Sequence, residues 1–345
     1  MAATHLRDTP LNVQLFKEDD DQDDLAHKKI IHALITGAVT PAAAARDFDA
    51  WVMAESSRRH EKLALRADWD NLTAEEQASG MTMRMLTPNA SGYIEDAFTT
   101  LAKLLPAFPP AHEGQDRIVQ FLLELRALPR HDAPDSIADA EAREVRYIKL
   151  WPFGGNWQAT AELYRWQAAD VLSNRSEMQK LHTETRARWC NLQSAMARLT
   201  SESLIDCSFL CSLDDIMPQN CGYPSADGKA RETGDMNRLS ADAVAGAQWV
   251  LRTEEGRWVY ARCREESAGI RQDTGEWETE ERCRRMWSLE RWSEWKRQFR
   301  SIASDDQFDK DSRGLVQLAV ERMEEYEADE YEADEYEADE YEADD

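Results

Sequence analysis

The apolar residues of this chain recur at the spacing of an α-helix along most of its length. Two segments show this most clearly, and their apolar residues are Ile94, Phe98, Leu101 and Leu105 in the first and Leu289, Trp292, Trp295, Phe299 and Ile302 in the second. Such stripes form the buried face of an amphipathic helix. Gly and Pro are scarce, at 14 and 11 residues, and they gather between the striped segments. We therefore predict an all-α fold, a multi-helix globular bundle of ten or more helices with disordered acidic ends.

Several helix starts can be placed from capping residues. Thr40 precedes Pro41, which is a favourable N-cap followed by Pro in the first turn. Ser240, Ser288 and Ser312 are also expected to cap helices. A further helical pattern is expected from after Asp135 to about Leu150. Seven Trp residues should lie in the core or line a groove: Trp151, Trp166, Trp189, Trp249, Trp258, Trp292 and Trp295.

The acidic residues gather near the two ends of the chain. Residues 324–345 contain 14 acidic residues and no Lys or Arg, so about half of the net charge of -26 lies there. Residues 18–24 add six acidic residues in seven positions. Like charges at this density oppose compaction, so we expect both segments to be disordered. The expected organisation is an acidic N-terminus (1–24), an N-terminal helical lobe (25–135), a second helical region (136–323) and an acidic tail (324–345).

The tail contains one internal repeat, Glu-Tyr-Glu-Ala-Asp, which occurs four times between Glu325 and Asp344. A step of five residues turns a helix by a net angle of about 140°, so the tyrosines do not share one helix face. We interpret the segment as low-complexity sequence, either without function or acting as an acidic arm for basic partners or divalent cations. The candidate partner-binding residues are Glu325, Tyr326, Glu330, Tyr331, Glu335, Tyr336, Glu340 and Tyr341.

Familiar catalytic and cofactor motifs are missing from the sequence. It contains no glycine-rich phosphate loop, no HExxH helix and no GxSxG elbow. Residues Asp19–Asp24 satisfy the DDxxD spacing by which all-α terpene synthases hold Mg²⁺, but a dense acidic run fits many spacings by chance. The six cysteines lack metal-ligand spacing and are expected to be reduced, buried thiols. We predict no catalytic residue, no metal site and no cofactor.

Charge and hydropathy narrow the choice of partners and location. An excess of acidic residues repels nucleic-acid phosphates and anionic lipid. No run of about 18 apolar residues exists, and the first 30 residues contain no apolar segment typical of a secretory signal. We expect a protein partner, of unknown identity and basic if the tail binds it, and we expect no nucleic acid and no membrane. A cytoplasmic or nuclear location follows.

Residues 281–300 form the most basic segment, with seven basic and three acidic residues between its aromatic ones. Basic residues beside aromatic ones can bind single-stranded nucleic acid. Here the aromatic residues share the apolar stripe, which favours core packing with a solvated basic face. We hypothesise that the acidic tail folds back onto this face through salt-sensitive contacts.

Several strings resemble a family of uncharacterised filamentous-fungal proteins, the domain of unknown function three-six-three-two. The most specific is Ser288–Phe299, which reads SLERWSEWKRQF. Weaker matches are residues 151–153, 189–199, 247–250 and 256–260. The resemblance covers about Leu150 to Met323 and does not include the tail repeat. It implies an intracellular, mostly helical protein, and it supplies no activity, ligand or catalytic residue.

These observations favour an intracellular helical scaffold or protein-interaction protein that is not an enzyme. One alternative is an enzyme or small-molecule binder with an aromatic-lined pocket between helices. The other is a protein that uses its acidic tail to bind basic partners.

Overall fold

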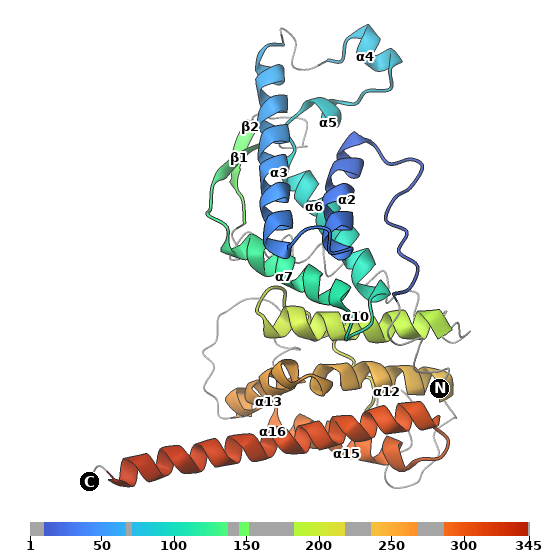
Figure 1. Ribbon diagram of the computed structural model, residues 1–345, viewed down its shortest axis with the longest axis vertical. Coiled ribbons are helices and arrows are strands. Elements are labelled where there is room, and N and C mark those ends of the chain that lie inside the picture. The colour runs from blue at the N-terminus through green and yellow to red at the C-terminus, as the bar shows by residue number, and fades with distance from the viewer. Residues whose placement is uncertain are drawn as a thin grey trace. The chain divides into compact units, whose positions relative to one another are not determined.

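The computed structural model describes residues 10–66, 71–136, 145–151, 183–217, 236–267 and 286–343, and the chain divides into two compact units. The N-terminal unit comprises Asn12–Ala107 and Ala111–Ala168, and the C-terminal unit comprises Ala169–Asp345 with Met1–Leu11 and Phe108–Pro110. Helices dominate both units (Figure 1), which confirms the all-α class with ten or more helices. No helix among these residues is long and apolar enough to cross a bilayer.

The N-terminal unit is built around one long helix. Its elements are α2 (Gln22–Ile35), α3 (Pro41–Ala64), α4 (Ala74–Ala78), α5 (Met83–Leu86), α6 (Ala90–Leu104), the 3₁₀ turn η1 (Leu105–Ala107), α7 (Glu113–Ala127), β1 (Asp132–Ser136) and β2 (Val145–Lys149). Helix α3 begins as predicted, because the Thr40 side chain accepts a hydrogen bond from the amide of Ala43 and Pro41 is the first helical residue. Its apolar stripe packs against α2, α6, α7 and β1, with Phe48 and Val52 fully buried.

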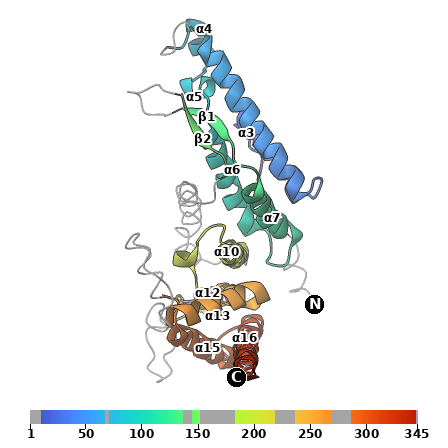
Figure 2. The same cartoon turned by 90° about the vertical axis from the view of Figure 1, so that its left-hand side faces the viewer.

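Strands β1 and β2 form an antiparallel hairpin that the sequence analysis missed (Figure 2). The segment before Leu150 is a strand where we expected a helix, and its Val, Tyr and Ile residues suit a strand. The buried carboxylate of Asp135 joins the hairpin to α6, because it accepts hydrogen bonds from Ser91 and Arg146. The lobe boundary expected after residue 135 falls inside β1, so the first unit extends further than predicted.

The C-terminal unit is a layered set of helices. Its elements are α10 (Thr183–Ser201), the 3₁₀ turn η2 (Ser208–Leu210), α12 (Met236–Leu251), α13 (Thr253–Ser267), α15 (Leu289–Ser304) and α16 (Lys310–Ala343). Helix α12 packs against α10, α13 and α16, and α15 packs against α16. Four tryptophans form one aromatic cluster, in which the ring of Trp287 lies 6.2 Å from Trp249, 5.5 Å from Trp258 and 6.0 Å from Trp295. Trp249, Trp287 and Trp295 are buried and Trp258 is half-buried. Trp189 and Trp292 of this unit and Trp151 of the N-terminal unit are buried as expected, whereas Trp166 lies outside the described residues.

Parts of both acidic segments lie in helices where the structure describes them. Asp21 caps α2 by accepting hydrogen bonds from the amides of Asp23 and Asp24, both at 2.8 Å. Acidic residues at a helix N-terminus are also stabilised by the helix dipole. At the other end, α16 continues through the repeats to Ala343, so the tail boundary expected at residue 324 lies inside a helix. Glu and Ala are good helix formers, and residues 324–330 are held by basic partners described below.

Two predicted caps are displaced. Helix α15 begins after Ser288, whose hydroxyl accepts from the amide of Arg291, as predicted. Ser240 and Ser312 instead lie inside α12 and α16, and the carboxylate of Asp309 accepts from the amide of Ser312 at 2.9 Å.

Candidate functional site

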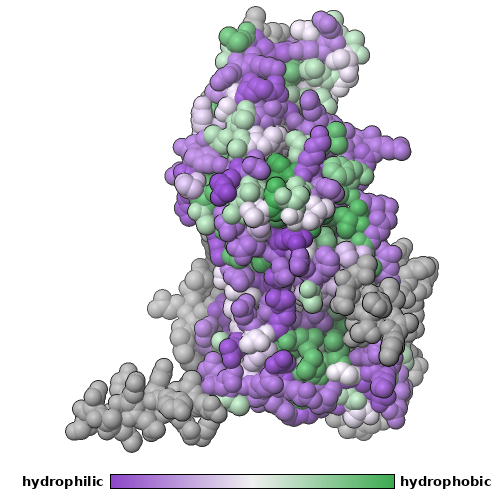
Figure 3. Space-filling view, viewed as in Figure 1, coloured by the Kyte–Doolittle hydropathy of each residue, from purple (hydrophilic) through white to green (hydrophobic). Residues whose placement is uncertain are grey.

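The N-terminal unit contains a groove of about 750 Å³ between the start of α2, the second half of α3, and α4 and α5. Its apolar wall comprises Trp51, Leu63, Met81, Met85 and Leu86. Its charged wall contains both signs, with acidic residues from α2, α3 and α4 and basic residues from α3 and the segment that follows it. Figure 3 shows that hydrophilic residues cover most of the visible surface of this unit, with small hydrophobic areas between them. The groove therefore offers apolar contact and charge together.

Helix α3 supplies the charged wall because of its residue spacing. The charged residues of this wall are spaced three or four residues apart: Glu55, Arg59, Lys62 and Arg66. This spacing places the first three on one face of α3, and Arg66 follows shortly after the helix ends. Arg59 also continues the buried stripe that runs through Val52 and Leu63, and it is only 6% exposed. An arginine so deep in a protein needs carboxylate partners.

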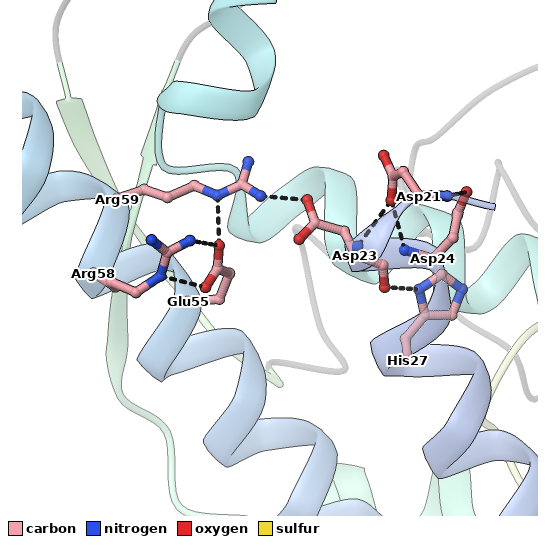
Figure 4. Close-up of polar contacts among 7 residues, drawn as sticks. All are labelled: Asp21, Asp23, Asp24, His27, Glu55, Arg58 and Arg59. Carbon is pink, nitrogen blue, oxygen red and sulfur yellow. Dashed lines mark hydrogen bonds and ion pairs between the residues drawn. The ribbon is translucent and has the colours of Figure 1, made fainter. Parts of the chain in front are cut away.

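Arg59 has two such partners, one on its own helix and one on α2 (Figure 4). Its Nε donates to Glu55 at 2.7 Å, and its guanidinium also donates to Asp23. Arg58 pairs with the same carboxylate of Glu55 from the exposed side. This network links the N-terminus of α2 to α3 through charges that lie largely out of water.

Burial changes the ionisation of the carboxylates in this network. The pKa of Asp23 is raised, because loss of hydration outweighs the attraction of Arg59. Burial also acts to raise the pKa of Glu55, but hydrogen bonds from Arg58 and Arg59 together outweigh it and lower the pKa.

A smaller pocket of about 260 Å³ adjoins the groove and shares Asp21, Asp23, Arg59 and Met85 with it. Asp24 and Asp96 add two more carboxylates to its wall, so four acidic residues and one basic residue surround it. Tyr93 lines the same pocket and is 2% exposed. Among the residues that the structure describes, none partners the Tyr93 hydroxyl, and burial raises the pKa of this phenol. We call this smaller space the acidic pocket.

The groove is more basic further along α3. Arg66 donates two hydrogen bonds to Glu76, at 2.6 and 2.9 Å. These bonds, together with hydrogen bonds between Glu76 and Thr73, lower the pKa of Glu76 to about 2. Lys62 is exposed and has no ion pair within the described part of the chain. The groove therefore has its acidic pocket beside Arg59 and an uncompensated positive charge at Lys62.

The histidine nearest to this site is held in structural contacts. His27 is buried beside it, and burial lowers the pKa of its imidazole. Its Nδ1 lies 3.1 Å from the carbonyl oxygen of Asp23 and its Nε2 lies 3.4 Å from the Thr100 hydroxyl, so both nitrogens have structural contacts. Across the described ranges, no group of three or more His, Cys, Asp or Glu side chains could hold a metal ion. The acidic run at Asp19–Asp24 instead caps α2 and pairs with Lys28 and Arg59.

The sequence-predicted site residues lie elsewhere, in the C-terminal unit. Tyr326 is 1% exposed and contacts its own chain, so it is not a surface residue. Glu325 pairs with Arg322, and Glu330 pairs with Arg264. The side chains of Tyr331, Glu335, Tyr336, Glu340 and Tyr341 lie outside the described residues.

The cysteine prediction holds for the buried positions. Cys207, Cys211 and Cys263 are buried and Cys190 is half-buried, and none of these four forms a disulfide. Burial raises the pKa of Cys263 to about 12, which makes it a poor nucleophile. Cys221 and Cys283 lie outside the described residues.

Sequence reasoning missed the groove, although one signal was present. Arg59 occupies a position of the apolar stripe of α3, four residues after Glu55. A charged residue at a stripe position indicates a buried ion pair. Its partner Asp23 is 36 residues away in sequence, and no local pattern predicts such a contact.

Comparison with known proteins places the chain in a family without assigning it an activity. No curated protein and no solved structure matches it. A family model described as "Protein of unknown function (DUF3632)" matches residues 95–299. The match begins earlier and ends earlier than the resemblance suggested, and Asp96 is the one groove or pocket residue within it. Because this match covers more than half of its length, the chain belongs to the family described as Protein of unknown function (DUF3632).

Proposed function

We propose that this chain is a helical protein-interaction protein without catalytic activity, and that its groove receives a segment of a partner protein. The observation that carries the proposal is the junction of the 750 Å³ groove with the acidic pocket at Asp23 and Arg59. This junction combines buried charge, an apolar wall and an unpartnered Tyr93 hydroxyl.

The composition of the groove favours a partner segment over a small molecule. Small-molecule sites are mostly apolar and bury most of the ligand surface. Here eight charged side chains line the groove, four acidic and four basic: Asp21, Asp23, Glu55, Glu76, Arg58, Arg59, Lys62 and Arg66. A peptide can match such a surface with its own side chains and backbone.

The charges also indicate which side chains the partner should present. A lysine or arginine of the partner fits the acidic pocket, whose lining has four carboxylates and one arginine and where the Tyr93 oxygen can act as an acceptor. An acidic residue fits beside Lys62, and apolar residues fit against Met81 and Met85.

The experiment that tests the proposal is site-specific photocrosslinking in the cells from which the protein comes. The full chain carries a photoreactive phenylalanine analogue either at Met85 in the groove or at Leu318 on α16. Both side chains are 42% exposed, so Leu318 is a matched control. We expect a discrete crosslinked protein from position 85 and none of that mass from position 318. Equal crosslinking from both positions, or none from position 85, would contradict the proposal.

Two pairs of substitutions then locate the contact within the groove. Lys62→Ala should reduce crosslinking from position 85, whereas Lys29→Ala, which removes an exposed lysine of α2 outside the groove, should not. Asp96→Asn in the acidic pocket should also reduce it, while Glu95→Gln next to it should not. Because these contacts are electrostatic, high salt should weaken the crosslink.

The site of action forms part of the proposal. Four cysteines without disulfides agree with an intracellular location, cytoplasmic or nuclear. A filamentous-fungal source is proposed from the resemblance of Ser288–Phe299 and the weaker strings. Imaging of the tagged full chain in its native cells tests the location, and a secreted or membrane-bound population would contradict it.

A further inference from the structure

The first tail repeat, Glu325–Asp329, is bound by the body of the C-terminal unit. Tyr326 is 1% exposed, and its hydroxyl lies 3.0 Å from the carbonyl oxygen of Val250 and 3.2 Å from that of Arg252. Val250 lies in the last turn of α12, where backbone acceptors lack partners within the helix. The carbonyl of Arg252, just after α12, also accepts from the amide of Gly256 at 2.9 Å. The tyrosine therefore joins α16 to the backbone between α12 and α13.

The ring of Tyr326 fits a slot that depends on one glycine. A Cβ atom added at Gly256 would lie 2.2 Å from Cε2 of Tyr326 and 2.6 Å from its Cζ. Such distances are far below van der Waals contact, so any larger residue at position 256 would exclude the ring. The slot between α12, α13 and α16 is thus shaped for an aromatic side chain.

Basic residues of α13 and α15 surround this slot and bind the acidic neighbours of Tyr326. Glu327 lies 2.5 Å from the Lys296 ammonium and accepts from Trp292 Nε1 at 2.7 Å. Asp329 pairs with Arg257 at 2.6 Å. The remaining two pairs join Glu324 to Arg300 and Glu330 to Arg264. Lys296 and Arg300 belong to the basic face of residues 281–300, so the start of the tail contacts that face, whereas Arg257 and Arg264 lie on α13.

The bound pattern is a tyrosine with acidic residues one, three and four positions after it, and another two positions before it. The same pattern occurs around Tyr331, with Glu332, Asp334, Glu335 and Asp329, and again around Tyr336. We propose that this surface, the repeat receptor, recognises the Glu-Tyr-Glu-Ala-Asp motif and that a later repeat of a second copy of this chain can occupy it. The proposal concerns the C-terminal unit and does not depend on the groove.

The chain's own first repeat competes for the receptor. A segment joined to its receptor by a short stretch of helix has a high effective concentration, so it prevails over a separate molecule at ordinary concentrations. The wild-type chain should therefore associate weakly through this contact. Loss of Tyr326 from its slot should expose the receptor while three intact copies of the motif remain on every chain.

The test is sedimentation equilibrium of the full-length chain. Tyr326→Ala opens the slot and should self-associate at least about tenfold more tightly than the wild type, since the competing cis repeat is weakened. Self-association should return to the wild-type level when all four tail tyrosines are replaced, by Tyr326→Ala, Tyr331→Ala, Tyr336→Ala and Tyr341→Ala together. Tyr326→Ala combined with Gly256→Ala should do the same, because the added methyl group narrows the slot.

The proposal would be overturned if the Tyr326→Ala variant associated no more tightly than the wild type. It would also be overturned if the four-tyrosine variant associated as tightly as the Tyr326→Ala variant. If the Tyr326→Ala chain does not fold by circular dichroism, the wild type decides the question. A synthetic peptide with the sequence of residues 325–339 should then shift the Tyr326 signal of ¹³Cζ-tyrosine-labelled protein. A peptide of equal charge with alanine at each tyrosine should not, and an identical response to both peptides would overturn the proposal.

Discussion

The two acidic segments of this chain share one sequence signal but have different roles in the structure. In residues 18–24, Asp21 caps α2 while Asp20 and Asp23 pair with Lys28 and Arg59. In residues 324–330, four acidic side chains pair with basic residues of α13 and α15 around the buried Tyr326. The first segment borders an open groove, whereas the second fills the slot that it contacts. Within the described parts of both segments, basic residues elsewhere in the chain compensate several of the acidic charges.

The two acidic segments differ in how deeply their ion pairs are buried and in whether open space remains beside them. The Asp20–Lys28 pair has side chains only 3% and 10% exposed, whereas those of Arg257 and Asp329 are 57% and 50% exposed. Buried pairs are screened little by salt, and exposed pairs are screened strongly. The N-terminal pairs of Asp20 and Asp23 should thus resist salt, whereas the exposed C-terminal pairs of Glu324 and Asp329 should weaken with it.

The largest effect is expected from Arg59→Leu. This change leaves Asp23 and Glu55 partly buried without their shared cation, and breaking such a pair costs about 3–5 kcal/mol. Urea unfolding followed by circular dichroism measures the loss. Arg58→Leu is the matched control, because the Arg58 side chain is 49% exposed and its pair contributes at most about 1 kcal/mol. Equal losses for the two variants would show that the network is not buried.

Gly256→Ala should destabilise the chain by about 1–3 kcal/mol, because the new methyl group overlaps the ring of Tyr326. In the Tyr326→Ala background the same change should have little effect. A double-mutant cycle of unfolding free energies measures this coupling. Additive effects would mean that Tyr326 does not occupy the slot.

Two tyrosine-to-phenylalanine substitutions compare the units directly. Tyr326→Phe removes a hydroxyl that binds backbone carbonyls and should cost about 1 kcal/mol. Tyr93→Phe removes a buried hydroxyl without a partner among the described residues, so the unfolding free energy should stay the same or rise slightly. Thermal or urea unfolding checks both. A clear loss from Tyr93→Phe would indicate that the acidic pocket is already satisfied internally.

The smallest effect is expected from Glu76→Gln, which should change how the stability of the chain depends on pH under acidic conditions. The folded-state pKa of Glu76 is lowered to about 2 from an ordinary value of 4.5. A depressed carboxyl pKa contributes stability that is present above pH 4.5 and is lost as the pH falls towards 2. Glu76→Gln should therefore unfold with a shallower pH dependence in this window. An unchanged profile would argue against the Arg66–Glu76 pair.

The sequence predicts the helices better than the contacts between them. Apolar stripes and caps such as Thr40 and Ser288 act within one or two helical turns, so they can be recognised locally. The hairpin escaped prediction because Asp132–Ser136 contains none of the residues typical of strands and is defined by its pairing with β2. Arg59 and Asp23 meet only after α2 and α3 pack, and so no sequence window contains their site. The tail contact was foreseeable from opposite charge, but the role of Gly256 was not.

Hydrogen–deuterium exchange of the full chain at low and high salt tests the central contrast most directly. At low salt, the amides of Gln22–Ile35 and of residues 324–330 should both be protected, because each belongs to a packed helix. At high salt, protection of residues 324–330 should fall first, while α2 keeps its own. Exchange of residues 324–330 at the rate of an unfolded chain, already at low salt, would contradict the account.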